Sequence, residues 1–523
     1  MKKIEIYDTS LRDGAQSEGI NFSAQDKIKI VHILDELGVE YIEAGWPGAN
    51  PKDADVFKLL RDIPLQNSQI CAFGCTRKAH GKVEEDKVLQ ELIAAQTPIV
   101  TIFGKSWDFQ VEHALGVSLA ENLAMIGESV AYLKAAGKKV FFDAEHYFDG
   151  YKANPQYALA ALQAAHQAGA ERLILCDTNG GCIYNEIEQI TQATLQALPE
   201  AQLGIHAHND SDTAISNSLA AVVAGAIQVQ GTINGYGERC GNANLCSVIP
   251  NLQLKLGYQL LGDKIEQLVR VAHEVSEIAN KKLYRDTPFV GPSAFTHKAG
   301  IHASGVIKNS ATYEHISPEQ VGNVRRILLS DQAGLASLKN KIQHLKLGIN
   351  IPDEKMPQVI SYIKEQEWKG FSFENADASF ELMLMDWLGQ QDKLFEFLGF
   401  RLITDTFRQR MDGIAAEGTV KLRVGEQLVH TVADGNGPVE AIDRALRLAL
   451  REYYPEIDSF KLSDYKVRIL DGRNGTEAKT RVHIETTNGV QRWDTMGVSQ
   501  NITEASCMAI VDSIHYGLLL GRA

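Results

Sequence analysis

The feature that most constrains the fold is an alternation of short apolar runs and amphipathic helical runs over residues 1 to about 235. A strand followed by a helix, eight times within roughly 250 residues, predicts a (β/α)8 barrel of the TIM type. A doubly wound open sheet is the alternative, but no glycine-rich dinucleotide-binding motif follows the first strand. The predicted strands are residues 4–7, 41–44, 69–73, 99–103, 139–142, 172–175, 203–205 and 227–233.

Polar residues follow six of these strands at the point where each strand ends. In a (β/α)8 barrel the carboxyl ends of the strands form the catalytic face. Because the six ends converge on one mouth, the sequence predicts a polar active site there. The segments are residues 8–16, 43–47, 143–146, 176–180, 206–210 and 234–242.

The seventh of these strands predicts a metal site. His206 and His208 are two residues apart on a strand, so their side chains share one face. Two imidazoles bind a divalent metal when a carboxylate and further oxygen ligands complete the site. We expect Asp13 to supply the carboxylate and Asn242 a fourth, weaker oxygen ligand, directly or through water. This ligand set suits Mn²⁺, Mg²⁺ or Zn²⁺ acting as a Lewis acid.

These residues also have simpler interpretations. The two histidines could be ordinary core or surface residues, and Arg12 with Asp13 could form a surface ion pair that contributes little to stability. In the functional interpretation, Arg12 faces the same mouth and holds a substrate carboxylate or a developing oxyanion. The convergence of the polar strand ends favours the functional interpretation.

Composition limits the partners. A net charge of −14 argues against nucleic acid or an anionic membrane as the main partner. The seven cysteines are odd in number and scattered, as in a protein of a reducing cytosol. The N-terminus lacks the apolar core of a signal peptide, and no segment approaches a transmembrane span. We therefore expect a cytoplasmic protein.

The remainder of the chain predicts two further parts. Residues 1–275 form the predicted catalytic barrel, and residues 276–396 a linker region with helical runs at 330–345 and 353–366 that completes the active site. Residues 397–523 predict an α+β regulatory domain. There strands followed by a helix occur twice, which predicts an internal repeat. The repeat units are strands 420–424 and 427–432 with helix 438–452, then strands 465–469, 480–486 and 490–496 with helix 503–519.

A glycine-containing loop precedes the final helix of each repeat unit, at residues 434–437 and 497–501. Such a loop can present the N–H groups of a helix N-terminus to a carboxylate. Asp434, with Gly435 and Gly437, could then bind an amino acid, the aspartate pairing with the ammonium group. The alternative is that both loops are ordinary tight turns.

Three segments carry a family resemblance: residues 8–16 (DTSLRDGAQ), 206–210 (HAHND) and 237–243 (GERCGNA). They resemble the family of 2-isopropylmalate synthases, homocitrate synthases and citramalate synthases, and the similarity extends over essentially the whole chain. The resemblance implies condensation of acetyl-CoA with a 2-oxo acid, followed by thioester hydrolysis. It also implies a homodimer, and a metal bound by Asp13, His206 and His208 with Asn242 nearby.

The resemblance implies further roles. Glu145 matches a glutamate that positions substrate and catalytic water, and Thr178 a hydroxyl that contacts the substrate carboxylate. His302 and Tyr313 match a catalytic histidine and tyrosine on a segment that reaches over a barrel mouth, often the partner's. The base for acetyl-CoA is therefore either Glu145 or the His302/Tyr313 pair. The family's C-terminal module binds an end-product amino acid as inhibitor.

The 2-oxo acid depends on pocket size. Trp46, Phe73 and Phe103 end inner strands and leave little room, which favours pyruvate, although each could be barrel core. Residues 313–316 (YEHI) and 493–499 (WDTMGVS) resemble the citramalate-forming branch, for which isoleucine is the expected inhibitor. The alternatives are a 2-isopropylmalate synthase with 2-oxoisovalerate and leucine, a metal-dependent carbon–carbon lyase, and an amino-acid sensor with an inactive barrel. The presence of Arg12, Asp13, His206 and His208 argues against the sensor, because an inactive barrel would not need these catalytic residues.

Overall fold

The computed structural model describes residues 2–298, 300–328, 335–343, 345–374, 376–390, 393–404, 416–470 and 478–522. The chain divides into two compact units, which are described separately. The barrel unit comprises Met1–Phe295 and His315–Arg325, and the C-terminal unit comprises Thr296–Glu314 and Arg326–Ala523. The three-part division predicted from the sequence stays a prediction.

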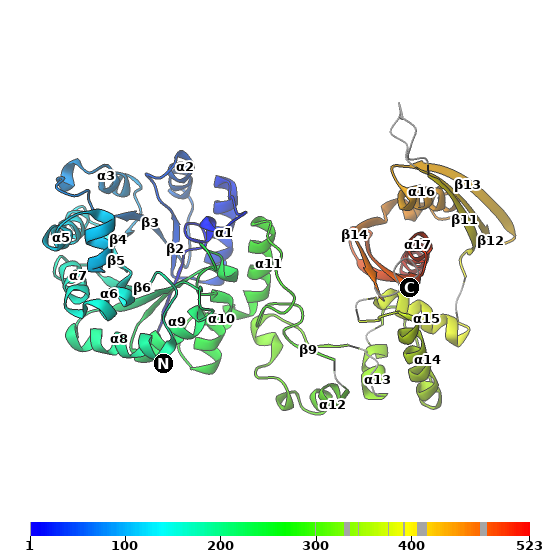
Figure 1. Ribbon diagram of the computed structural model, residues 1–523. Helices are drawn as coiled ribbons and strands as arrows, with labels where there is room; N and C mark the ends of the chain where they lie inside the picture. Colours follow the sequence, from blue (N-terminus) through cyan, green and yellow to red (C-terminus); the bar gives the residue numbers. More distant parts are fainter. Residues whose placement is uncertain are drawn as a thin grey trace. The chain divides into compact units, whose positions relative to one another are not determined.

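Eight parallel strands form a closed barrel, as predicted (Figure 1). The first strand pairs with both the second and the eighth, which closes the sheet. Most strands extend one or two residues beyond their predicted ends, so several polar residues lie within them. The strands are β1 (Glu5–Asp8), β2 (Tyr41–Gly45), β3 (Gln69–Cys75), β4 (Ile99–Lys105), β5 (Lys139–Glu145), β6 (Arg172–Asp177), β7 (Leu203–Ala207) and β8 (Gln228–Gly231).

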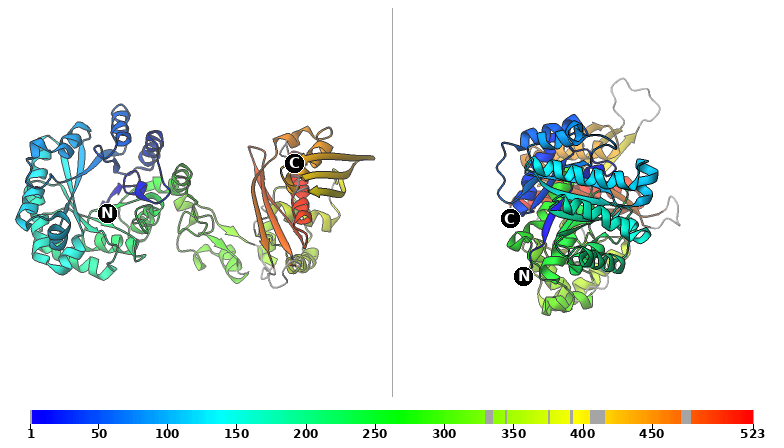
Figure 2. Two further views of the ribbon diagram at one scale, coloured as in Figure 1. Left: turned by 45° about the horizontal axis from the view of Figure 1, so that its top comes forward. Right: turned by 90° about the vertical axis from the view of Figure 1, so that its left-hand side faces the viewer.

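Helices surround the strands on the outside of the barrel (Figure 2). The first begins at a capping box in which the backbone N–H groups of Ser23 and Asp26 are each accepted by the other's side chain. It ends at Gly38, whose φ of 89° is left-handed. The main helices of this unit are α1 (Ala24–Leu37), α2 (Pro51–Leu60), α3 (Lys87–Ala94), α5 (Leu119–Ala135), α6 (Tyr147–Ala153), α7 (Pro155–Gln167), α8 (Tyr184–Ala197), α9 (Ala214–Ala224), α10 (Leu245–Pro250) and α11 (Leu268–Ile278).

The interior of the barrel is filled by side chains that alternate with outward-facing ones. Near the amino ends of the strands, Arg172 forms an ion pair with Glu5 at 2.7 Å. Above it lies a buried apolar cluster of Tyr7, Tyr41, Cys71, Ile99 and Phe141. The inward positions beyond this cluster, toward the carboxyl ends, are predominantly polar, and this layer forms the floor of the site described below.

The C-terminal unit begins with helices and a short two-stranded sheet of β9 (Thr296–His297) and β10 (Arg326–Ile327). The run predicted at 353–366 is a helical turn followed by α14, and the described part of the run predicted at 330–345 is α13. Among the described residues, no helix is both long and apolar enough to cross a membrane. The helices are α12 (Gly300–Lys308), α13 (Leu335–Gln343), α14 (Met356–Lys369) and α15 (Asp377–Leu388).

The rest of this unit confirms the predicted repeat. Two three-stranded antiparallel sheets are each followed by a helix. The first strand of the first sheet was not predicted, because a register shift between Phe397 and Gly399 breaks its alternation. The elements are β11 (Glu396–Thr404), β12 (Ala416–Val424), β13 (Gln427–Gly435) and α16 (Pro438–Leu450), then β14 (Lys461–Ile469), β15 (Thr480–Thr487), β16 (Arg492–Ser499) and α17 (Ile502–Leu520).

The two halves of the repeat pack their helices in the same way. Thr431 on β13 donates its hydroxyl to the carbonyl of Ala445 at 2.8 Å. Thr495 on β16 donates equivalently to Ala509 at 2.7 Å. A side chain at Gly435 would lie 2.5 Å from the backbone nitrogen of Ala441, so glycine allows the close approach of α16 to its sheet.

Candidate active site

A cavity of about 250 Å³ opens at the carboxyl ends of the barrel strands. Its position is the one at which (β/α)8 enzymes place their active sites. One part of its wall is charged and the other is aromatic. Six of the residues predicted from the sequence line it, namely Arg12, Asp13, Glu145, Thr178, His206 and His208.

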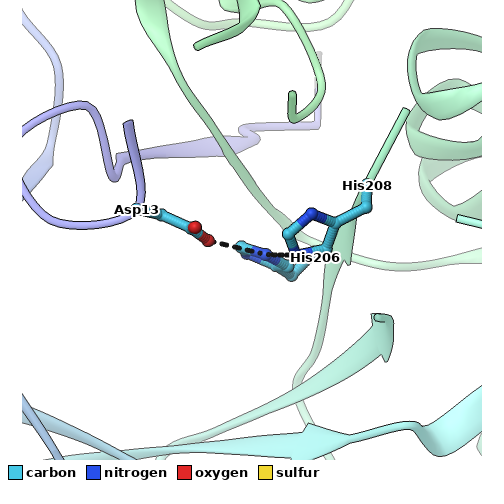
Figure 3. A group of neighbouring side chains, drawn as sticks. All are labelled: Asp13, His206 and His208. Atoms are coloured by element: carbon cyan, nitrogen blue, oxygen red, sulfur yellow. Dashed lines mark hydrogen bonds and ion pairs between the residues drawn. The ribbon is translucent and has the colours of Figure 1, made fainter. Parts of the chain in front are cut away.

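Asp13, His206 and His208 converge on one point (Figure 3). Nε2 of His206 lies 3.2 Å from Oδ2 of Asp13 and 3.4 Å from Nε2 of His208. One ligand atom from each residue lies within 4.8 Å of the other two, and all three side chains are buried. Nδ1 of His208 is also buried and has no hydrogen-bond partner among the residues that the structure describes. Two nitrogens and a carboxylate oxygen in this arrangement fit a divalent cation.

Asn242 lies beside this cluster, held by a bridge between its backbone and that of His208. Its amide nitrogen donates to Oδ2 of Asp13 at 3.0 Å and lies 3.3 Å from Nε2 of His206. Its oxygen, the atom predicted to bind metal, is buried and has no partner in the described part of the chain. Turning the amide group would bring the oxygen to the cluster, since the two ends of an amide are nearly alike in shape. The role of Asn242 as a ligand stays a prediction.

The charges of the cluster suit a cation. Burial raises the pKa of Asp13, but Arg12 and then His206 lower it more, so this pKa lies well below its usual range. Burial, followed by the charge of His206, lowers the pKa of His208 to about 4. Burial lowers the pKa of His206, but Asp13 outweighs burial and raises it. At neutral pH Asp13 is therefore a carboxylate and His208 is neutral, and cation binding displaces any proton on His206.

Arg12 is fixed by a buried acidic partner. Its Nε donates to Glu43 at 2.5 Å, and its Nη1 lies 3.5 Å from Asp13. Its guanidinium lies 3.7 Å above the ring of Phe73. Glu43 is fully buried and also accepts a hydrogen bond of 2.7 Å from Tyr7. No role for Glu43 was predicted, although a charged residue inside the apolar run 41–44 was a usable signal.

Glu145 and Thr178 are held by neighbours for which no role was predicted. Glu145 forms an ion pair of 2.5 Å with Lys105 at the end of β4. The hydroxyl of Thr178 accepts from the backbone of His146 at 2.8 Å, and its carbonyl accepts from Arg239 at 2.7 Å. Both side chains therefore face the cavity in fixed positions.

The aromatic part of the wall consists of Trp46, Phe73 and Phe103. Their ring centroids lie 5.6 to 5.9 Å apart, with the two phenylalanines stacked and the indole edge-on to both. All three side chains line the cavity. They make a rigid apolar surface beside the Arg12 guanidinium.

His302 and Tyr313 belong to the C-terminal unit. Their rings stack with centroids 4.1 Å apart and an interplanar angle of 25°. His302 lies on α12, and Tyr313 follows the short turn at Ser310–Thr312. The two residues named together by the resemblance are thus neighbours, while their action at the barrel cavity stays a prediction.

The predicted effector residues lie where β13 meets α16. Asp434 is exposed, and its carbonyl accepts from Arg444 at 3.1 Å. Gly437 precedes the helix, and the N–H of Asn436 is bonded to Glu440 at 2.9 Å. Gly435 already has a packing role. Binding of an amino acid there stays a prediction.

Comparison with known proteins assigns the family. Residues 3–275 match the HMGL-like family, residues 289–370 the homocitrate synthase post-HMGL domain-like family, and residues 374–518 the LeuA allosteric (dimerisation) domain. The (R)-citramalate synthase of Synechocystis sp. is 52% identical over 98% of this chain and 96% of its own. That of Aquifex aeolicus is 51% identical over 99% and 98%. A probable 2-isopropylmalate synthase of Methanopyrus kandleri is 32% identical over 98% of both chains. The chain therefore belongs to the HMGL-like family and, within it, to the (R)-citramalate synthase family.

Proposed function

We propose that the barrel cavity condenses acetyl-CoA with pyruvate and water to give (R)-citramalate and CoA. The observation that carries the proposal is one small cavity with an aromatic wall on one side and Arg12 with the Asp13–His206–His208 cluster on the other. Pyruvate has the matching chemistry, a methyl group at one end and a 2-oxo carboxylate at the other. The full-length similarity to (R)-citramalate synthases supports the same reaction.

Asp13, His206 and His208 would hold a divalent ion such as Mn²⁺, Mg²⁺ or Zn²⁺, with Asn242 beside it. A bound ion of this kind supplies Lewis-acid polarisation of a 2-oxo acid. Attack on the carbonyl carbon converts the carbonyl oxygen to an alkoxide, whose charge the Arg12 guanidinium stabilises. The Thr178 hydroxyl donates to the substrate carboxylate.

Carbon–carbon bond formation needs a base. Removal of a methyl proton from acetyl-CoA gives a carbanion that attacks the keto carbon of pyruvate, and the alkoxide then takes up a proton. Water next hydrolyses the thioester and releases the CoA thiol. Glu145 and the His302/Tyr313 pair are the two candidates for the base. The ion pair of 2.5 Å with Lys105 holds the Glu145 carboxyl group at the cavity wall, where it can accept a proton or position water.

The first test measures substrate choice by free-thiol release from acetyl-CoA. We expect pyruvate to exceed 2-oxoisovalerate in kcat/KM by about 10²-fold or more, because two additional methyl groups clash with the aromatic wall. Phe103→Ala should narrow this ratio at least tenfold, whereas Tyr184→Ala on the exposed surface should leave it unchanged. A higher kcat/KM for 2-oxoisovalerate in the wild type would instead support 2-isopropylmalate synthesis.

We propose a homodimer with shared sites, supported by the match to the LeuA allosteric (dimerisation) domain. Arg12→Ala and His302→Ala chains should each be inactive. If His302 acts in the partner's barrel, each mixed dimer contains one intact site, and random exchange should restore about a quarter of wild-type activity. The measurement is thiol release after mixing, with exchange followed by differently tagged chains. Exchange without recovery would mean that each chain supplies its own His302.

We propose isoleucine as a feedback inhibitor bound near Asp434, Gly435 and Gly437. The exposed carboxylate of Asp434, near the end of β13, could pair with the ammonium group of an amino acid. Asp434→Ala should raise the isoleucine concentration for half-inhibition roughly 10- to 150-fold, because the ammonium group loses a charged hydrogen-bond partner worth about 1.5–3 kcal/mol. Glu426→Ala, at an exposed turn of the same sheet, is the control. Unchanged inhibition would remove Asp434 from the effector site, and inhibition by leucine alone would favour the isopropylmalate alternative.

We also propose that the protein acts in the cytoplasm. All seven cysteines are free thiols. Free thiols persist in reducing compartments, where glutathione and thioredoxin keep disulfides from forming. Fractionation of the source cells with an antibody against the chain would test this location.

A further inference from the structure

A buried chain of hydrogen bonds begins at the edge of the histidine cluster. Nδ1 of His206 lies 2.9 Å from Oε1 of Gln230 on β8. The amide nitrogen of Gln230 in turn donates to Oδ1 of Asp143 on β5 at 3.1 Å. His206, Gln230 and Asp143 are all buried. None of the steps described above uses Gln230 or Asp143.

The polarity of the Gln230 amide fixes the proton on His206. An amide oxygen only accepts hydrogen bonds, so Nδ1 of His206 must be the donor in the 2.9 Å contact. Neutral His206 then has a bare Nε2, and this is the atom that lies 3.2 Å from Asp13 and 3.4 Å from His208. At its other end the amide nitrogen donates to Asp143, whose carboxylate form only accepts hydrogen bonds, and this contact sets the orientation of the amide.

We propose that Gln230 is a positioning residue for the metal site: it holds His206 in the tautomer that leaves Nε2 free to bind a cation, and Asp143 sets the direction of its amide. The inference rests on the proposed metal-dependent function. Groups that accept the second N–H of a metal-binding histidine fix its ring and raise its basicity, and losing one lowers metal affinity by about 10–100-fold.

The same strand provides a matched control. Gln228 lies two residues earlier, is fully buried and also faces the barrel interior. Its amide nitrogen donates to Glu5 at 3.2 Å, and it contacts no histidine of the cluster. Replacing either glutamine by methionine therefore removes a buried amide of equal size from β8, but only the change at residue 230 affects His206.

The experiment measures metal affinity independently of catalysis. Mn²⁺ and Zn²⁺ are titrated into metal-free wild type, Gln230→Met and Gln228→Met full-length proteins in competition with a chelating indicator. We expect Gln230→Met to weaken Kd about 10–100-fold, and Gln228→Met to remain within about threefold of the wild type. The melting temperatures of the metal-free proteins should fall by similar amounts in the two variants.

Two results would contradict the proposal in different ways. A wild type that binds neither ion would overturn the proposed metal site itself, and the inference with it. Normal wild-type binding with an equal Kd in Gln230→Met would overturn the inference alone. If Gln230→Met yields no folded protein, Gln230→Asn replaces it: it keeps an amide beside Asp143 but is one methylene too short to reach both partners. The same 10–100-fold loss is expected of it, and wild-type affinity would overturn the inference.

Discussion

Replacing His206 by alanine is expected to abolish metal binding and to lower kcat/KM by about 10³-fold or more. The change removes the nitrogen that lies between Asp13 and His208, at 3.2 Å and 3.4 Å from their ligand atoms. Only two of the three proposed ligands then remain. Lewis-acid polarisation by a bound ion typically lowers an activation free energy by several kcal/mol, and under the proposed mechanism this contribution would be lost with the ion. Metal content by elemental analysis and thiol release from acetyl-CoA measure the two effects.

The matched control is His32→Ala, which removes an exposed histidine from α1 and should alter neither quantity. Treatment of the wild type with a chelator should reproduce the loss of activity, and added Mn²⁺ or Zn²⁺ should restore it. Full activity of the His206→Ala protein, or of a metal-free wild type, would exclude the metal-dependent mechanism.

Replacing Arg12 by methionine is expected to reduce both stability and turnover. Glu43 is fully buried, and without the guanidinium its carboxylate retains, among the described residues, the hydrogen bond from Tyr7. Removing one partner of a buried ion pair typically costs about 3–5 kcal/mol. The loss of stabilisation for the developing alkoxide should lower kcat by about 10²–10³-fold. Chemical denaturation and steady-state kinetics measure the two losses.

The double variant Arg12→Met/Glu43→Gln separates these losses. A neutral glutamine no longer leaves an unpaired buried charge, so most of the lost unfolding free energy should return. Turnover should stay low because the guanidinium is still absent. Recovery of activity together with stability would show that Arg12 supports the fold and takes no direct part in the chemistry.

The barrel was predictable because its signal is repeated. Eight strand–helix units leave few topologies open, and the errors were confined to strand ends. The predicted strand 139–142, for example, continues through Asp143 to Glu145. Polar residues were taken to mark the end of a strand, whereas in a barrel the last inward-facing positions of a strand are where an active site needs polar side chains.

The site was only partly predictable, because many of its contacts join residues on different strands. The spacing of His206 and His208 indicated the metal site, and six of the seven predicted barrel residues line the cavity, Asn242 being the exception. No roles were predicted for Glu43, Lys105 and Gln230, because their partners come from other strands. Which inward positions face one another depends on the stagger of the closed barrel, and a single sequence does not contain that stagger.

Closure of the barrel also determines the order in which this chain can fold during synthesis. Residues of β1 pair with those of β8, Glu5 with Gln228, and the two are 223 positions apart. At about 5–20 residues per second, β1 leaves the ribosome roughly 10–45 s before its partner. Through that interval the growing sheet has two open edges, which are sites for aggregation and for chaperone binding. The antiparallel hairpin of β12 and β13, in which Val424 pairs with Gln427, needs no such wait.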